Sequence, residues 1–229
     1  MTGLRVIRPR GRVMRIGRMP DPWAWPPWEA QHSDNTFGNR WDDPEGVYRV
    51  VYACSQLEGA YVEVLSRLRP DPAVLAGLTE IAGPDPGYRI GIVPSSWLTN
   101  RAVGAATIRG DYVDIGHAAS LAYLRTAMAG RLIRHGVADL DAAAIRLSAP
   151  RRLTQEISNH IYKLSAVSGA ARFAGIEYES RLGDNYQNWA VFERPAQEAI
   201  SEPIVEPVRR DDPALSAALA ALGLQLELE

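Results

Sequence analysis

The stretch FGNRWDDPEGVYRVVYACSQLEGAYVEVL, residues 37–65, combines side chains that could form a ligand-binding site. Its pattern predicts a charged loop, then an apolar strand, then a helix. The loop carries the pair Arg40 and Trp41, the strand carries Tyr48 and Tyr52, and the helix carries Glu63. Folding explains the apolar residues of this stretch, but it does not explain this set of a cation, aromatic rings and an acid.

The expected geometry brings Tyr52 and Glu63 to about the same level. A helix that follows the strand through Ser55 can fold back along it, so that Tyr52 lies about 10 Å before the turn and Glu63 about 12 Å after it. Glu63 then lies on a flank of the helix, and Gly59 leaves room beside the carboxylate. The alternative is that Glu63 is solvated and Gly59 packs closely on a neighbour. The pattern alone leaves both interpretations open.

The elements that must position this set are a strand and the helix after it. Residues 46–54 are apolar on both faces, which predicts a central strand of a sheet. Ser55-Gln56-Leu57-Glu58 has the S-x-x-E pattern of a capping box, which predicts that the helix begins there. Apolar residues at helical spacing continue the helix until Pro70 stops it, and Asp71-Pro72 predicts the start of another helix that ends near residue 81.

The rest of the chain mixes short strands with helices. Further strands are predicted at the N-terminus and over residues 88–93, 103–115 with a break at 110–111, 175–181 and 188–192. Helices are predicted over residues 117–135, 140–145, 151–164 and 212–223, and the final LQLELE predicts an edge strand. This order favours an α+β fold with a mixed, partly antiparallel sheet and flanking helices.

The composition is that of an ordinary globular protein. The chain has 229 residues, of which 46% are hydrophobic and 23% charged, and we expect one domain over residues 1–229 with a C-terminal helix and edge strand in 203–229. The net charge of −2 argues against nucleic acid or a membrane as partner. No targeting segment or long apolar span is present in the sequence, so a cytoplasmic location is expected. The single cysteine, Cys54, excludes an internal disulfide.

Two other patterns have competing interpretations. Residues 153–169, LTQEISNHIYKLSAVSG, begin like a helix-turn-helix motif, so a DNA-binding regulator is one alternative; an amphipathic core helix explains the same pattern. The first eighteen residues hold six arginines and no acid, which fits either a polyanion-binding arm or an exposed face of edge strands. The histidines are scattered without ligand spacing, so we expect no metal site.

Four separated stretches resemble the RES domain family, which is named for an arginine, a glutamate and a serine in that order. They are VMRIGR, NRWDDP followed by VVYA, AYVEVL, and GIEYESRLGDNYQNWAVFE. The resemblance covers about residues 12–192 as the core of a single RES-like domain, and it implies an ADP-ribosyltransferase-like fold. It places Arg40, Glu63 and Ser180 at the three naming positions, with Tyr52 and Arg15 at further motif positions.

Members of this family are toxins of toxin–antitoxin pairs that degrade NAD. The resemblance therefore implies an NAD phosphorylase or NAD glycohydrolase, with NAD as substrate, inorganic phosphate or water as acceptor, no cofactor, and a cognate antitoxin as partner. A protein ADP-ribosyltransferase, which transfers the ribosyl group to a macromolecule, is the alternative. The acceptor and the oligomeric state stay open.

The resemblance also implies a role for each matched residue. The expected catalytic residues are Glu63, which would stabilise positive charge on the ribose, and Arg40, which would hold the pyrophosphate. The expected substrate-binding residues assist Arg40, stack on the nicotinamide ring or position it by hydrogen bonding. They are Arg15 for the pyrophosphate, Tyr52 with Trp41 or Tyr48 for stacking, and Ser180 for hydrogen bonding.

Overall fold

The fold is described from a computed structural model that covers residues 3–82, 91–147, 149–166, 168–195 and 197–228. One large sheet contains β1 (Val6–Ile7), β2 (Val13–Arg18), β3 (Val50–Cys54), β5 (Arg101–Ile108), β6 (Tyr112–Asp114), β7 (Gly175–Glu179), β8 (Gln187–Phe192) and β9 (Ile200–Pro207). A separate pair contains β4 (Ile92–Val93) and β10 (Gln225–Leu226). The helices are α1 (Leu57–Leu65), α2 (Pro72–Ala82), α3 (Ser95–Thr99), α4 (Ala118–Ala127), α5 (Ala129–Arg134), α6 (Ala142–Leu147), α7 (Arg151–Lys163) and α8 (Pro213–Leu222).

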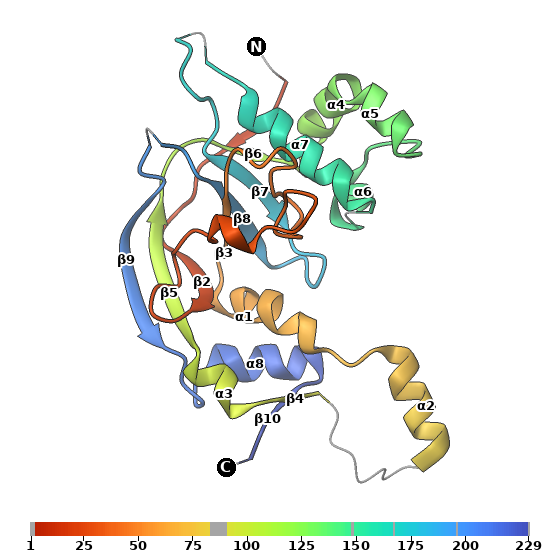
Figure 1. The fold of residues 1–229 in the computed structure, drawn as a ribbon, viewed down its shortest axis with the longest axis vertical. Coiled ribbons are helices and arrows are strands. Elements are labelled where there is room, and N and C mark those ends of the chain that lie inside the picture. Colours follow the sequence, from red (N-terminus) through yellow and green to blue (C-terminus); the bar gives the residue numbers. More distant parts are fainter. Residues whose placement is uncertain (1–2, 83–90, 148, 167, 196, 229) are drawn as a thin grey trace.

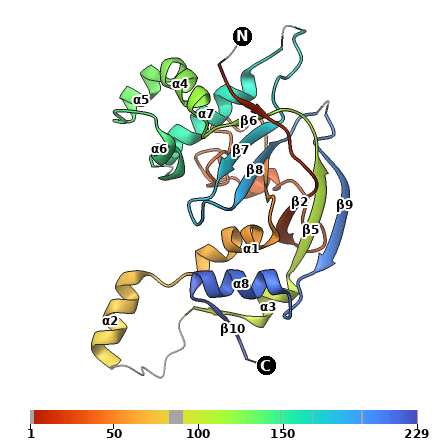
Figure 2. The same cartoon turned by 180° about the vertical axis from the view of Figure 1, so that it is seen from behind.

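The large sheet is mostly antiparallel, and β3 lies inside it. The strand order is β1-β6-β7-β8-β3-β2-β5-β9, and only the neighbours β6 and β7 run parallel. Helices α4 to α7 gather at one end of the molecule, and α1, α3 and α8 gather at the other, while α2 projects away from the body (Figures 1 and 2). This arrangement confirms the predicted α+β class and the predicted central position of β3.

Two hydrophobic clusters share one face of the sheet. The first includes Trp41, Ile157 and Phe192 and lies under α4 to α7. The second includes Tyr61 and Leu215 and joins α1 to α8. A third cluster lies on the opposite face of the sheet. Its strand members occupy the intervening positions of the same strands, and successive side chains of a strand point to opposite faces.

A row of side chains crosses the sheet where the first two clusters meet. The antiparallel registers place Tyr178 opposite Asn188, Asn188 opposite Cys54, and Cys54 opposite Met14. Tyr178 belongs to the first cluster, and Cys54 and Met14 belong to the second, so Asn188 lies at their boundary. A polar side chain at this position is available to any group that the helices bring over the sheet.

Several predicted boundaries are wrong for identifiable reasons. Helix α1 begins at Leu57 without a side-chain cap, because the Ser55 hydroxyl donates to Gln187 Oε1 and accepts from Trp189 Nε1. The helix predicted over 117–135 is two helices, separated at Met128, whose φ and ψ of −108° and 8° are not helical.

The remaining differences concern the edges and the C-terminal half. Strand β9 was not predicted, because ISEPIVEP contains two prolines; it pairs with β5 at the sheet edge, where proline is tolerated. The strand predicted over 88–93 is β4 at residues 92–93, and residues 88–90 lie outside the described part of the chain. Of the final LQLELE, residues 225–226 form a strand, β10, which pairs with β4.

Helix α7 is a core helix, which confirms the amphipathic interpretation of residues 153–169 and not the helix-turn-helix alternative. Its buried residues include Leu153, Ile157 and Ile161. In the described residues between 164 and 174 no second helix follows; the chain instead makes a bridge between Ser165 and Ala171 and enters β7. Among the described residues, every helix is too short or too polar to cross a membrane.

Candidate functional site

The position of Glu63 is set by the close packing of α1 on the sheet. A Cβ atom added to Gly59 would lie 2.5 Å from Cys54 Sγ and 2.9 Å from Tyr186 Cδ1, so only glycine allows this approach. Tyr61 and Leu65 on the helix are fully buried. The interpretation that Gly59 packs closely on a neighbour is therefore confirmed, and this packing carries the half-buried Glu63 over β8.

The Glu63 carboxylate receives two hydrogen bonds from residues far away in the sequence. Ser180 Oγ donates to Glu63 Oε1 at 2.6 Å, and Asn188 Nδ2 donates to the same oxygen at 3.0 Å. Both donors are buried, with exposed fractions of 1% and 2%. Both bonds end on Oε1, and among the described residues no hydrogen bond to Oε2 is found. The structure therefore brings Glu63 and Ser180 together, and it adds Asn188.

Sequence reasoning missed Asn188 for a simple reason. Asn188 opens the strand that was predicted over 188–192, where a polar residue is usual and gives no signal of its own. Its contact with Glu63 depends on the register, which places it beside Cys54 of β3 and therefore under α1.

Arg40 lies on the other side of the same region. Its Nη2 donates to the Arg146 carbonyl at 3.0 Å, and its guanidinium carbon is 5.2 Å from the centre of the Tyr178 ring. Burial lowers the pKa of Arg40, while Tyr178 and the charge of Glu63 oppose this shift. Arg40 and Glu63 thus interact electrostatically, although no direct hydrogen bond joins them among the described residues.

The loop that carries Arg40 is held by buried hydrogen bonds. Asp42 accepts from the backbone N–H groups of Phe37 and Asn39, at 3.0 and 2.7 Å, and from the Tyr52 hydroxyl at 2.9 Å. The Tyr52 hydroxyl also accepts from the Trp41 N–H at 3.0 Å. Burial raises the pKa of Asp42, and these hydrogen bonds oppose the shift. The hydroxyl of Tyr52 therefore anchors the loop to β3.

Trp41 and Tyr48, which we expected to assist stacking on a substrate, lie in the core. Their exposed fractions are 0% and 2%. Tyr48 stacks on Tyr162 with 3.8 Å between ring centres and hydrogen-bonds to Ser158. Because protein encloses both rings, a substrate ring could reach them only after a rearrangement.

Arg15 is bound to backbone carbonyl groups. Its Nε donates to the Pro22 carbonyl and its Nη1 to the Tyr52 carbonyl, both at 2.6 Å. Strand β2 pairs with β3 only at Met14 and Cys54, so this guanidinium supplies a partner where the ladder is incomplete. Burial lowers the pKa of Arg15 to about 10. Its contacts hold the two strands together.

Tyr178 is a second residue that sequence reasoning missed. Its ring lies beneath Arg40 and 5.6 Å from the Trp41 ring centre. Burial raises the pKa of Tyr178, the charge of Glu63 adds to the shift, and the charge of Arg40 opposes it. The only available signal was its place in the stretch GIEYES, two residues before Ser180.

A cavity of about 330 Å³ borders this cluster through Tyr178 and Arg146. Glu63 and Arg40 do not line it, and its remaining lining residues come mainly from β7, α6 and the turn before α4. They are Ile7, Asp114, Ile115, Gly116, His117, Ala142, Ile145, Glu177, Glu179 and Gln187. The cavity is an accessory space beside the cluster rather than its centre.

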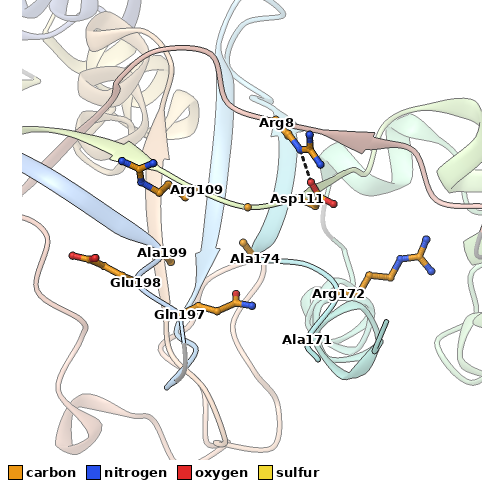
Figure 3. Close-up of a pocket in the computed structure, with 10 residues that line it drawn as sticks. Arg8, Arg109, Asp111, Ala171, Arg172, Ala174, Gln197, Glu198 and Ala199 are labelled. Atoms are coloured by element: carbon orange, nitrogen blue, oxygen red, sulfur yellow. Dashed lines mark hydrogen bonds and ion pairs between the residues drawn. The ribbon is translucent and has the colours of Figure 1, made fainter. Parts of the chain in front are cut away.

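A larger cavity of about 600 Å³ lies elsewhere and is lined by three arginines, Arg8, Arg109 and Arg172. Figure 3 shows that Arg109 and Arg172 extend to opposite sides and that Arg8 is paired with Asp111. The three cations therefore do not converge on one ligand position. Within the part of the chain that the structure describes, no group of three or more His, Cys, Asp or Glu side chains is arranged to hold a metal ion.

Comparison with known proteins gives one family match. The family model described as RES domain matches residues 12–212. No curated protein matches the chain. Among solved structures, the chain is similar to the crystal structure of the M. tuberculosis MbcT–MbcA toxin–antitoxin complex, with 15% identity and a TM-score of 0.48; the match covers 88% of this chain and 87% of that chain.

Proposed function

Because the chain belongs to the RES domain family, we propose that it is an NAD-degrading enzyme that cleaves the bond between nicotinamide and ribose. The observation that carries this proposal is the Glu63 carboxylate, held on one oxygen by Ser180 and Asn188 and placed in electrostatic range of Arg40. Arg40, Glu63 and Ser180 are the three residue types for which the family is named, and they come from three separate parts of the chain.

Glu63 would act on the charge that develops during cleavage. As the bond between ribose C1′ and the nicotinamide nitrogen breaks, its electron pair leaves with the nitrogen, so nicotinamide departs neutral and positive charge builds on the ribose. A fixed carboxylate beside the sugar stabilises that charge, and a partly dehydrated site strengthens the effect. Ser180 and Asn188 position Glu63 by holding Oε1, which leaves Oε2 for the ribose.

Arg40 would bind the pyrophosphate of the dinucleotide. A guanidinium matches the geometry of phosphate oxygens and stays charged at neutral pH. An oxygen of inorganic phosphate or of water would then bond to C1′. The acceptor proton passes to solvent, and the products are nicotinamide with ADP-ribose or its phosphate.

The same family membership supports a biological setting for this reaction. We propose that the chain is the toxin of a toxin–antitoxin pair, that it acts in the cytoplasm, and that a cognate antitoxin protein restrains it. Mixing the purified chain with the product of a neighbouring reading frame would test this: the proposal expects a stable complex that no longer consumes NAD.

Product analysis with NAD tests the enzymatic proposal. We expect the purified chain to release nicotinamide, and Glu63→Gln to lower kcat by about 100-fold or more while the circular dichroism spectrum is unchanged. Glu58→Gln is the matched control, because Glu58 is an acid on the same helix that bonds to Tyr186 instead. Equal turnover by Glu63→Gln and the parent chain would show that Glu63 is wrongly assigned.

Mass spectrometry of the same reactions, with and without phosphate, identifies the acceptor. ADP-ribose indicates hydrolysis, and ADP-ribose phosphate that forms only with added phosphate indicates phosphorolysis. A ribosyl label that stays bound to protein would instead favour a protein ADP-ribosyltransferase.

A further inference from the structure

We propose that Arg151 is a second anion-binding residue of this site and that Arg40 and Arg151 together hold a phosphoryl group. The inference rests on the proposed function, since it names a subsite of the same site. Arg151 lies outside the motif stretches that pointed to Arg40, Glu63 and Ser180, and only the packing of α7 brings it there.

Helix α7 lies along the loop that carries Arg40. Gln155 Nε2 donates to the Asn39 carbonyl at 3.1 Å, and Ser158 Oγ donates to the Trp41 carbonyl at 2.6 Å, so these contacts flank Arg40 on both sides. Arg151 precedes Gln155 by four residues, and residues four apart lie on the same side of a helix. The exposed Arg151 side chain therefore starts one turn from the contact at Asn39.

Arg40 is incompletely paired in this arrangement. Its Nη2 donates to the Arg146 carbonyl, but its Nη1 is buried, and no partner for that atom lies among the described residues. Leaving a buried donor of a charged group unsatisfied is costly. An anion beside Arg40 would supply the acceptor that Nη1 lacks.

The surrounding charges favour the same occupant. The positive charge of Arg151 lowers the pKa values of both Arg40 and Tyr178, so the two guanidinium groups repel one another. The guanidinium of Arg146 is already paired with Glu179 and Asp184. A phosphoryl group next to Arg40 and Arg151 would remove their repulsion and accept hydrogen bonds from both.

The phosphoryl group has two sources in the proposed reaction, which are the pyrophosphate of NAD and inorganic phosphate as acceptor. Both present phosphoryl oxygens that a guanidinium group can bind through two hydrogen bonds. The proposed ligand is therefore a phosphoryl group from either source. Binding and kinetic measurements separate the sources.

Calorimetric binding of inorganic pyrophosphate and of inorganic phosphate to the full chain tests the site directly. We expect Arg151→Gln to weaken binding of at least one probe by about tenfold or more, which corresponds to the loss of one charged hydrogen bond, and Arg151→Lys to restore part of it. Arg152→Gln, which changes the adjacent arginine, is the matched control. This variant should bind pyrophosphate and phosphate with the affinity of the parent chain. Parent affinity in Arg151→Gln, or an equal loss in Arg152→Gln, would overturn the proposal.

Steady-state kinetics then identify the source. A rise in KM for NAD alone assigns Arg151 to the pyrophosphate, and a rise in KM for phosphate alone assigns it to the acceptor; unchanged values for both would refute a role in the reaction. If the parent chain does not consume NAD, the proposed function fails, while the calorimetric comparison still decides whether Arg40 and Arg151 bind a phosphoryl group.

Discussion

At the scale of single residues, Glu63 in the candidate site and Glu177 in the cavity beside it differ because of their neighbours. Glu63 is half-buried and receives hydrogen bonds from Ser180 and Asn188. Glu177 on β7 is 6% exposed and lies next to Asp114. Burial, and then the charge of Asp114, raises the pKa of Glu177 to about 7, while a hydrogen bond from Gln187 opposes the shift.

The raised pKa of Glu177 predicts a pH-dependent loss of stability. The folded chain holds a proton that the unfolded chain releases, so the free energy of unfolding falls as pH rises from about 4.5 to about 7. At ~1.4 kcal/mol per pKa unit the loss is at most about 3.5 kcal/mol. Urea unfolding should therefore show Glu177→Gln to be more stable than the parent at pH 8, with a smaller difference at pH 4.5.

Glu206→Gln serves as the control for this measurement, because Glu206 is an exposed acid on β9. Its stability should follow that of the parent chain at both pH values. If Glu177→Gln shows the same pH dependence as the parent, Glu177 does not carry a proton in the folded protein.

At the scale of elements, the site depends on a loop that is fixed to a strand through one hydroxyl. The Tyr52 hydroxyl on β3 donates to Asp42 and accepts from the Trp41 N–H, so it restrains the two residues that directly follow Arg40. The Arg40 side chain then extends to Tyr178. We therefore expect the hydrogen bonds of the Tyr52 hydroxyl on β3 to help fix the position of Arg40 on the loop.

Tyr52→Phe tests this anchoring role. We expect the substitution to lower the free energy of unfolding by about 1–3 kcal/mol, because it leaves buried partners unpaired, and to lower kcat/KM for NAD as Arg40 shifts. Urea unfolding and NAD turnover measure the two effects. If Tyr52 contributes only by stacking on nicotinamide, the phenylalanine ring would preserve both the stability and the rate.

Tyr112→Phe is a suitable comparison for the stability measurement. Tyr112 is fully buried, and its hydroxyl has no hydrogen-bond partner in the described part of the chain. Removing that hydroxyl should leave stability unchanged or raise it.

At the scale of the whole molecule, the site lies where two hydrophobic clusters meet. The position of Arg40 depends on the cluster under α4 to α7, because its neighbour Trp41 is buried there. The position of Glu63 depends on the cluster between α1 and α8, because neighbouring residues of α1 are buried there. The family match ends at residue 212, yet α8 begins at Pro213 and buries Leu215 against the α1 cluster. Residues beyond the matched region therefore help to support Glu63.

Leu215→Ala tests the support that α8 gives. Leu215 is fully buried, so its truncation should cost about 2–5 kcal/mol of unfolding free energy through lost contacts and a cavity. Denaturant unfolding measures this cost, and Ile133→Ala, which changes a 79% exposed residue, should cost far less. Equal effects of the two substitutions would show that α8 does not stabilise the folded chain.

How much the sequence predicted can be seen in particular elements. The apolar pattern of residues 46–54 indicated a central strand, and Asp212-Pro213 indicated the start of α8, where Asp212 does accept from the Ala214 N–H. Ser55 shows the limit: its S-x-x-E pattern predicted a cap, but β8 offered Gln187 and Trp189 as competing partners. A local pattern cannot anticipate a partner that lies more than a hundred residues away.

The sequence by itself determined the α+β class, the strand and helix that carry Tyr52 and Glu63, and the motif order that indicates the RES domain family. Only the tertiary structure decided which side chains meet: it joined Ser180 and Asn188 to Glu63, placed Tyr178 and α7 beside Arg40, and enclosed Trp41 and Tyr48 in the core. The physical reason is that hydrophobic periodicity fixes which face of an element is buried, whereas strand register and helix packing fix what that face touches.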